Sequence, residues 1–249
     1  GVYVEGFKEG KRFYKAAKQL AKPVVIIKGG KSKEGSKAST SHTGSIAGNY
    51  EVARAAFKQA GIIEAETSQE FFDIVKMFSY SHNKKVEGNK IAIVSNAGGL
   101  GVLSADMVSK TKLELASYTP LTKERLTKYY PDYLRSNVGD NPSDLGGGIN
   151  DEDFIKCLHI IIEDQNVNAV IVSPGVETQP MRDMPLVENI IRLFNENNKP
   201  IIVTMPDSNA NRKLMDIMEE KSIPCYVTPE QAVKTLDKYI NYNLRKKKA

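Results

Sequence analysis

Short runs of apolar residues alternate along this chain with longer segments of helical periodicity. Residues 24–27, 169–173 and 200–205 are almost continuously apolar, as is typical of strands that are buried on both faces of a parallel sheet. Between such runs the apolar residues recur every three or four positions, which predicts amphipathic helices. Strands that alternate with helices pair in parallel, because each helix carries the chain back to the edge where the previous strand began. The sequence therefore predicts an α/β fold built on parallel sheets.

A polar stretch over residues 81–89 divides this pattern into two series, and its lysines and glycine are typical of a domain boundary. We predict a first unit over residues 1–82, a linker over 83–89 and a second unit over 90–249. The second series contains five apolar runs and predicts a five-stranded, flavodoxin-like parallel sheet. The first series contains three and resembles the back half of such a unit, without its N-terminal strands. The expected strands are residues 2–4, 24–27, 62–65, 90–95, 113–116, 169–173, 200–205 and 223–227.

Composition and charge exclude several classes of protein. Of the 35 basic residues, four lie at 245–248, which leaves 31 against 30 acidic residues, so no basic face for nucleic acid is expected. No apolar run approaches the ~20 residues that span a bilayer, and the first residues do not resemble a signal peptide. Cys157 and Cys225 lie in apolar segments without the spacing of a zinc site. We therefore expect a cytoplasmic protein with reduced thiols, no bound metal, and neither nucleic acid nor membrane as a partner.

The most distinctive local composition surrounds His42. Residues 39–48 read Ser-Thr-Ser-His-Thr-Gly-Ser-Ile-Ala-Gly and precede a helix start at Asn49. Small neighbours leave the histidine accessible, and the two glycines allow sharp bends of the backbone. We predict an exposed loop in which a charged group can reach His42; a Ser/Gly-rich surface loop with an incidental histidine is the alternative. The loop residues beside it are Ser41, Thr43 and Gly44.

Two glycine-rich segments follow predicted strands. Residues 30–32 read Gly-Lys-Ser but lack the first glycine of a P-loop, because Val25 stands at that position. The second segment opens a helix and consists of Asn96, Ala97, Gly98, Gly99, Leu100 and Gly101. It lacks the first glycine of the dinucleotide fingerprint, and Ser117 replaces the acidic residue expected after the next strand. Backbone amides at a helix start attract phosphate, so we predict a phosphate-binding turn, with tight packing of helix on strand as the alternative.

Polar residues of two further segments complete the set of candidates. Glu5 ends the first predicted strand, at the edge where open α/β sheets bind ligands, and the loop after the neighbouring strand carries His42. Residues 137–150 form a long irregular loop of the kind that is often functional, although turn formation also explains its composition. The candidates in that loop are Asn141, Ser143 and Asp144. The other histidines, His82 and His159, are interpreted as structural or solvated.

Several of these segments together resemble one family. The run Ser-His-Thr-Gly-Ser-Ile-Ala-Gly at 41–48 resembles the phosphohistidine segment of the NDP-forming acyl-CoA synthetases. That family includes ADP-forming acetyl-CoA synthetase and, more distantly, succinyl-CoA synthetase. The likeness covers nearly the whole chain and is that of a C-terminal part of the alpha-type chain. Further segments that resemble family landmarks are residues 4–6, 28–32, 60–62, 96–101 and 141–144.

The resemblance implies a ligase that interconverts acyl-CoA, ADP and phosphate with acid, CoA and ATP through an acyl phosphate. It implies that His42 carries the phosphoryl group, that Glu5 holds its imidazole, and that the turn at 96–101 cradles phosphate. This agrees with the chemistry, because a neutral imidazole is nucleophilic near pH 7 and a carboxylate on its other nitrogen fixes the tautomer.

The resemblance also implies partners and substrates. These are an ATP-grasp subunit or domain that binds Mg²⁺ with ATP or ADP, an N-terminal CoA-binding domain, CoA, a small acyl substrate and an oligomeric assembly. No tightly bound cofactor is expected, and this chain alone is expected to be inactive. Related protein acetyltransferases carry similar domains but commonly lack the histidine, so His42 argues against them. A non-catalytic or regulatory module is the other alternative, which stable phosphorylation of His42 would separate from a ligase.

Overall fold

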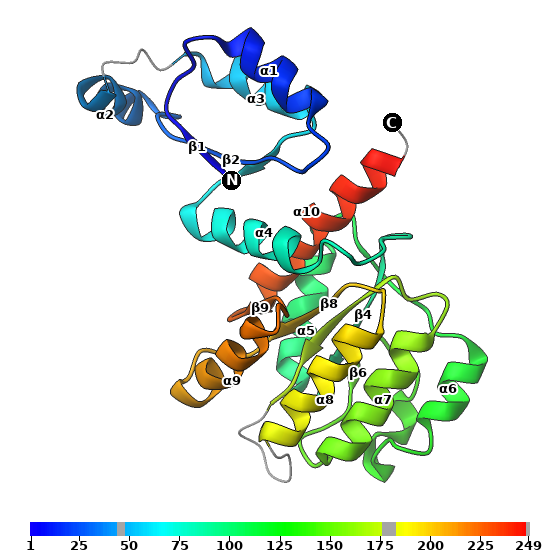
Figure 1. The fold of residues 1–249 in the computed structure, drawn as a ribbon. Helices are drawn as coiled ribbons and strands as arrows, with labels where there is room; N and C mark the ends of the chain where they lie inside the picture. The colour runs from blue at the N-terminus through cyan, green and yellow to red at the C-terminus, as the bar shows by residue number, and fades with distance from the viewer. Residues whose placement is uncertain (44–47, 176–182, 248–249) are drawn as a thin grey trace. The chain divides into compact units, whose positions relative to one another are not determined.

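The computed structural model describes residues 1–43, 48–175 and 183–247, with only the backbone described for His42, Thr43 and Asp183. The chain divides into two compact units, Gly1–Phe78 and Ser79–Ala249. Each unit contains a parallel sheet with helices between its strands (Figure 1), which confirms the predicted α/β class. No helix in the described ranges is long and apolar enough to cross a membrane.

The first unit is built on a three-stranded parallel sheet in the order β1-β2-β3. Its core forms where Ile26 of the central strand and Phe57 are buried together, and Phe7 packs edge-on to Phe57 with ring centres 5.9 Å apart. The strands are β1 (Val2–Val4), β2 (Val25–Lys28) and β3 (Ile63–Ala65). The helices in this part of the chain are α1 (Gly10–Gln19), α2 (Lys33–Thr43), α3 (Tyr50–Gln59) and α4 (Ser68–Tyr80).

Helix α2 corrects one prediction. The backbone of residues 33–43, which includes His42, is helical rather than an exposed loop, and Gly44 lies outside the described residues. The hydroxyl of Ser32 caps the helix by accepting from the Gly35 amide at 3.0 Å. Hydroxyls further along donate to carbonyls four residues earlier, as Thr40 does to Ser36 at 3.0 Å. These bonds give the hydroxyls inside the helix hydrogen-bond partners without interrupting its backbone.

The second unit has a six-stranded sheet in which every pairing is parallel. Its main path runs β5-β4-β7-β8-β9, which is the flavodoxin-like order. The prediction of five strands was therefore wrong by one, since the short strand β6 also pairs with β4. β5 pairs with the first residues of β4 and β6 with the last, as in Val94 opposite Ser143. The strands are β4 (Lys90–Ser95), β5 (Glu114–Leu115), β6 (Ser143–Asp144), β7 (Ala169–Ser173), β8 (Ile201–Thr204) and β9 (Cys225–Tyr226).

Helices cover both faces of this second sheet. Helices α6, α7 and α8 lie side by side over one face (Figure 1). Helices α5 and α10 pack against each other, and α5 also contacts β4 while α10 contacts β8 and β9. The strands β4 and β7 are buried almost throughout, and Phe154 and Leu158 of α7 are fully buried against them. The helices are α5 (Gly98–Val108), α6 (Pro120–Leu126), α7 (Asp151–Glu163), α8 (Asp183–Glu196), α9 (Asn209–Glu220) and α10 (Pro229–Lys247), with a 3-10 helix at Asp132–Asn137.

The polar stretch at residues 81–89, which was predicted to hold the domain boundary, packs within the second unit. Ser81 is fully buried and its carbonyl accepts from the Tyr239 hydroxyl at 2.6 Å. Lys84 is 8% exposed, and its ammonium donates to the carbonyls of Phe194 and Asn197 at the C-terminal end of α8. A cation there satisfies carbonyls that a helix end leaves without partners. The polar composition of residues 83–89 therefore serves contacts within the unit that begins at Ser79.

Candidate functional site

Glu5 follows β1 at the carboxyl edge of the first sheet. Its carboxylate accepts one hydrogen bond from the Tyr3 hydroxyl at 2.7 Å and one from the Ser39 hydroxyl at 2.9 Å. Ser39 is 5% exposed and belongs to α2. Position 42 lies three residues further along the same helix, and positions with that spacing share a helix face. The structure thus brings the predicted carboxylate to the helix that carries His42, through a serine that the sequence reasoning did not single out.

Lys28 fixes the main chain of Glu5 from the neighbouring strand. Its ammonium donates to the Glu5 carbonyl at 2.5 Å and to the Gly29 carbonyl. Lys28 is only 3% exposed; burial lowers its pKa, and the nearby Glu5 carboxylate opposes that shift. The sequence feature that could have indicated this contact is a lysine, Lys28, directly after the apolar run at residues 24–27.

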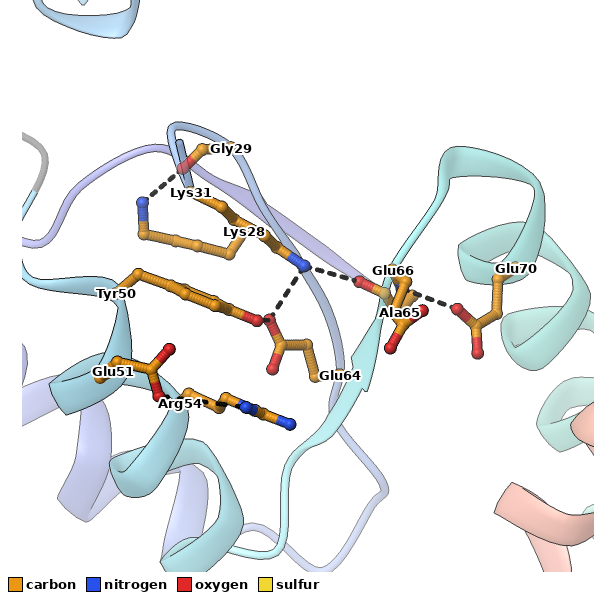
Figure 2. A network of polar contacts seen from close by, with 10 residues as sticks. All are labelled: Lys28, Gly29, Lys31, Tyr50, Glu51, Arg54, Glu64, Ala65, Glu66 and Glu70. Carbon is orange, nitrogen blue, oxygen red and sulfur yellow. Dashed lines mark hydrogen bonds and ion pairs between the residues drawn. The ribbon is translucent and has the colours of Figure 1, made fainter. Parts of the chain in front are cut away.

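A second polar cluster lies at the same edge of the first sheet (Figure 2). The Lys31 ammonium lies 3.1 Å from a carboxylate oxygen of Glu64 and 5.2 Å from the centre of the Tyr50 ring. The Tyr50 hydroxyl donates to the same carboxylate at 2.9 Å. Burial raises the pKa of Tyr50, and the hydrogen bond to Glu64 raises it further by a smaller amount. The sequence analysis considered Lys31 as part of an incomplete P-loop and of the family landmark at 28–32. It missed this cluster because the three residues meet only in the folded sheet.

In the second unit, the turn after β4 is tied to the neighbouring strand β7. The Ser95 hydroxyl accepts from the Ala97 amide at 3.0 Å and lies 2.9 Å from the Ser173 carbonyl. Asn96 is 2% exposed, and its side-chain oxygen accepts from the Gly175 amide at 2.5 Å. These bonds hold the start of α5 at the carboxyl edge of the sheet, where open α/β folds place ligands.

The glycines of this turn face different surroundings. A Cβ on Gly98 would lie 2.6 Å from a carboxylate oxygen of Asp144, and one on Gly101 would lie 3.2 Å from the Pro142 side chain. A Cβ on Gly99 would have no heavy atom within 4 Å. Tight packing therefore explains Gly98 and Gly101, whereas Gly99 leaves the first turn of α5 open.

The segment 141–144 is bound to β4 by side chains as well as by the β6 pairing. The Asn141 amide oxygen accepts from the Ile93 amide at 3.0 Å, and its nitrogen donates to the carbonyls of Ile91 and Ala116 at 2.8 and 3.0 Å. Asn141 thus joins β4 to the chain that follows β5. The structure brings together two predicted groups, residues 96–101 and 141–144, within the second unit.

Ser143 is held by buried hydroxyl and carbonyl groups. Its hydroxyl donates to the Asp140 carbonyl at 2.9 Å and lies 2.9 Å from the Tyr118 hydroxyl. Burial raises the pKa of Tyr118 far above its usual range, and the contact with Ser143 opposes the shift. Ser143 is fully buried, so its contacts support the loop. Asp144 is half-buried beside Gly98 and accepts from the Gly146 amide at 2.9 Å.

Two family matches cover most of the chain. Residues 1–78 match the succinyl-CoA ligase like flavodoxin domain, and residues 91–245 match the Ligase-CoA domain. The chain therefore belongs to the Ligase-CoA domain family, within the NDP-forming acyl-CoA synthetases that the sequence resembles. This confirms the family resemblance predicted from the His42 segment.

Individual relatives agree with this placement. The alpha subunit of acetate–CoA ligase (ADP-forming) II from Pyrococcus furiosus is 36% identical over 92% of this chain and 50% of its own length. Acetate–CoA ligase (ADP-forming) from Methanocaldococcus jannaschii is 36% identical over 99% of this chain and 35% of its own length. The solved structure of Ca. Korarchaeum cryptofilum dinucleotide forming acetyl-coenzyme A synthetase 1, in complex with phosphate and ADP, matches with a TM-score of 0.85 and 28% identity. That match covers 98% of this chain and 54% of the other. The chain spans about half, or less, of the length of these relatives.

Proposed function

We propose that this chain supplies the phosphoryl-carrying part of an ADP-forming acyl-CoA synthetase. Phosphate displaces CoA from an acyl-CoA, which gives an acyl phosphate and free CoA. The imidazole of His42 then takes the phosphoryl group and releases the carboxylate, and ADP takes the same group from the histidine to give ATP. Each step is reversible, so the same residues serve synthesis of the acyl-CoA from acid, CoA and ATP.

One observation carries the assignment of the histidine. The Glu5 carboxylate accepts from the Ser39 hydroxyl at 2.9 Å, and Ser39 precedes His42 by one turn of α2. The Glu5 carboxylate is held by the Tyr3 and Ser39 hydroxyls, and its main chain by Lys28, so it is suited to accept the Nδ1 or Nε2 proton of an imidazole on α2. That bond would leave the other ring nitrogen as the nucleophile.

The turn at residues 96–101 is proposed to hold phosphate. The helix that starts at Gly98 runs to Val108, and its first amides carry a partial positive charge of about +0.5. Gly99 offers open space at this start, so an oxyanion can approach the main chain. Asp144 lies beside Gly98, and its carboxylate would repel an anion on that side, so we place the phosphate on the side of Gly99.

The remaining parts of the reaction are assigned to partners. Among the described residues, no group of three His, Cys, Asp or Glu side chains could hold a metal ion. By likeness to the family, Mg²⁺ is proposed to arrive with ATP or ADP on an ATP-grasp subunit or domain. CoA is proposed to bind a CoA-binding domain like that of the family, and the acyl substrate to meet the phosphate at the assembled site.

Transfer of label from ATP tests this proposal. The chain is mixed with the ATP-grasp subunit or domain of its own enzyme, Mg²⁺ and ATP labelled in the γ-phosphate. We expect an adduct that is stable to base and labile to acid, as a phosphohistidine is, and that is absent from His42→Ala. The matched controls are His82→Ala and His159→Ala, which should label as the parent does. Equal labelling of His42→Ala and the parent would overturn the assignment.

A further inference from the structure

The second unit has a hollow in the helical layer formed by α6, α7 and α8. Its volume is about 370 Å³, within the range of about 300–1,000 Å³ that is usual for small-ligand sites. The three helices lie side by side over one face of the sheet (Figure 1), and the hollow opens across α7 between its two neighbours. None of the residues that line it belongs to the turn at 96–101, to the loop at 141–144 or to the first unit.

The wall of the hollow carries a surplus of positive charge. Four cationic side chains line it, and no Asp or Glu is among the lining residues. Arg125 is paired with Glu163 at 2.7 Å, and Lys156 with Glu152 at 2.6 Å. In the described part of the chain, neither of the other two cations forms an ion pair with a carboxylate. These two are Lys128 and Arg192.

The same hollow has an apolar floor and an aromatic rim. Ile155, Ile160 and Leu193 are at most 8% exposed and close its base. Tyr129 stands at the rim with the Lys156 ammonium 5.1 Å from its ring centre. An apolar base beside an aromatic ring favours a flat ring in the ligand, whereas unpaired cations favour a multiply charged anion such as phosphate.

We propose that this hollow binds a phosphorylated small molecule with a flat ring, of the nucleotide class. Lys128 and Arg192 take the phosphate groups, and Tyr129 with the apolar floor takes the ring. The Arg192 guanidinium already donates to the side-chain oxygen of Asn189 at 2.7 Å, which orients it while leaving further N–H groups for a phosphate. The site is separate from the phosphoryl-transfer site proposed above and would be an effector site of the second unit.

Binding of three probes to the chain tests this inference. ADP carries ring and phosphates, pyrophosphate carries only phosphates, and adenosine carries only the ring. We expect ADP to bind most tightly, and Lys128→Gln/Arg192→Gln to weaken ADP and pyrophosphate about tenfold or more, as loss of two charge-assisted contacts does. Tyr129→Leu should weaken ADP while leaving pyrophosphate unchanged. The matched control is Lys213→Gln/Lys221→Gln, which removes the same charge from exposed lysines of the α9 segment.

Two further variants keep the result decisive. Gly99→Val obstructs the turn at 96–101 and should leave ADP binding to the hollow intact. If ADP binding is lost only in Gly99→Val, or is equally weakened by both double variants, or is absent from the parent, the inference is wrong. If the double variant fails to fold, Lys128→Gln alone should still weaken ADP about threefold. Labelling of His42 does not enter this readout, so the two proposals can fail independently.

Discussion

The carboxyl edges of the two sheets are built from different chemistry. In the first sheet, charged side chains stand at two strand ends, Glu5 after β1 and Lys28 at the end of β2, and Glu64 lies within the short strand β3. At the edge of the second sheet, the turn and loop are held mainly by neutral groups, the hydroxyl of Ser95 and the amides of Asn96 and Asn141.

A phosphoryl carrier must activate its imidazole and must hold the phosphate, and the two edges are suited to one of these tasks each. Charged groups can orient an imidazole and exchange protons with it, and their strength depends on pH and on burial. Fixed amide dipoles at a helix start hold an anion without a proton of their own to lose. The first edge is thus suited to activating His42, and the second to holding phosphate, and each can be disturbed without the other.

The largest expected effect comes from Glu5→Gln. The amide keeps the shape of the side chain but removes the charge that would hold the imidazole. We expect phosphoryl transfer to slow by up to about 10⁴-fold, the loss seen when the orienting carboxylate of a catalytic histidine becomes an amide. Single-turnover labelling measures the rate, and thermal unfolding should change little, because Glu5 is half-buried and hydroxyls can also donate to an amide oxygen.

Glu66→Gln is the matched control for that substitution. Glu66 directly follows β3 and is exposed, so it is a strand-end carboxylate at the same edge without a contact to α2 among the described hydrogen bonds. It should label at the parent's rate. Equal rates for Glu5→Gln and Glu66→Gln would remove Glu5 from the mechanism.

The next largest effect is a loss of stability in the second unit, caused by a substitution at the carboxyl edge of its sheet. Asn141→Ala leaves three backbone groups, the Ile93 amide and the carbonyls of Ile91 and Ala116, without their side-chain partner. We expect a loss of about 2–4 kcal/mol in the free energy of unfolding of this unit, since the Ile93 amide and the Ala116 carbonyl lose this partner at about 1–3 kcal/mol each, whereas the Ile91 carbonyl still accepts from the Ala116 amide at 2.8 Å. Thermal unfolding followed by circular dichroism measures the loss. Asn137→Ala, at an exposed asparagine four positions earlier, should change stability by less than about 0.5 kcal/mol.

The sequence predicted the architecture of both edges better than their contacts. Alternation of apolar runs with amphipathic helices predicted parallel sheets, because βαβ units pair their strands in parallel. The flavodoxin-like unit was predicted as a common doubly wound arrangement of five such strands. The same reasoning placed Glu5 at a ligand edge. It missed strand β6, because a two-residue strand is stabilised by tertiary pairing such as the Leu145 amide to the Ser95 carbonyl at 2.7 Å.

Composition misled the prediction at His42 and left the contacts of residues 83–89 unpredicted. Ser and Gly around His42 indicated a loop, yet Ser32 caps α2 and hydroxyls within it bond to its own carbonyls. Lysines in residues 83–89 indicated a linker, but composition did not indicate that Lys84 satisfies the end of a helix more than a hundred positions away, at Phe194 and Asn197. In both cases the polar groups found partners within the fold, and composition alone does not report which partner a polar group has.

A smaller effect distinguishes the two glycines at the start of α5. Gly98→Ala places a methyl group 2.6 Å from the Asp144 carboxylate, so we expect it to destabilise the unit by about 1 kcal/mol, at the low end for overpacking because a carboxylate can shift. Gly99→Ala meets no atom within 4 Å and should be neutral or stabilising by up to about 1 kcal/mol. Urea unfolding measures both variants.

Phosphate affinity of the same two variants sharpens the comparison. If the open side of the turn holds phosphate, Gly99→Ala should weaken phosphate binding although it does not destabilise the fold, and Gly99→Val should weaken it further. Unchanged phosphate affinity in both Gly99 variants would remove phosphate binding as the explanation for Gly99 and leave packing as the explanation for Gly98 and Gly101 alone.

The smallest expected effect is a pH dependence confined to the first edge. Burial lowers the pKa of Lys28 below its usual 10.5, so the folded protein releases this proton at a lower pH than the unfolded chain does. Between those two pKa values the unfolded chain binds more protons, and the free energy of unfolding contributed by Lys28 therefore rises with pH. Below the folded pKa the penalty for burying the charge is fully present, and it is relieved as the pH approaches 10.5.

Lys28→Met should remove this rise. Urea unfolding of the parent and the variant at pH 8, 9 and 10 gives the difference in slope, from which tyrosine ionisation cancels because both proteins contain the same tyrosines. Lys22→Met, at an exposed lysine near the start of the same strand, should keep the parent's slope.

Phosphate binding at the second edge should be equally strong at each pH, because amide dipoles hold the phosphate. The titration of phosphate itself is taken into account in that measurement. A slope shared by the parent and Lys28→Met, or a phosphate affinity that falls with the Lys28 titration, would show that the two edges are not chemically separate.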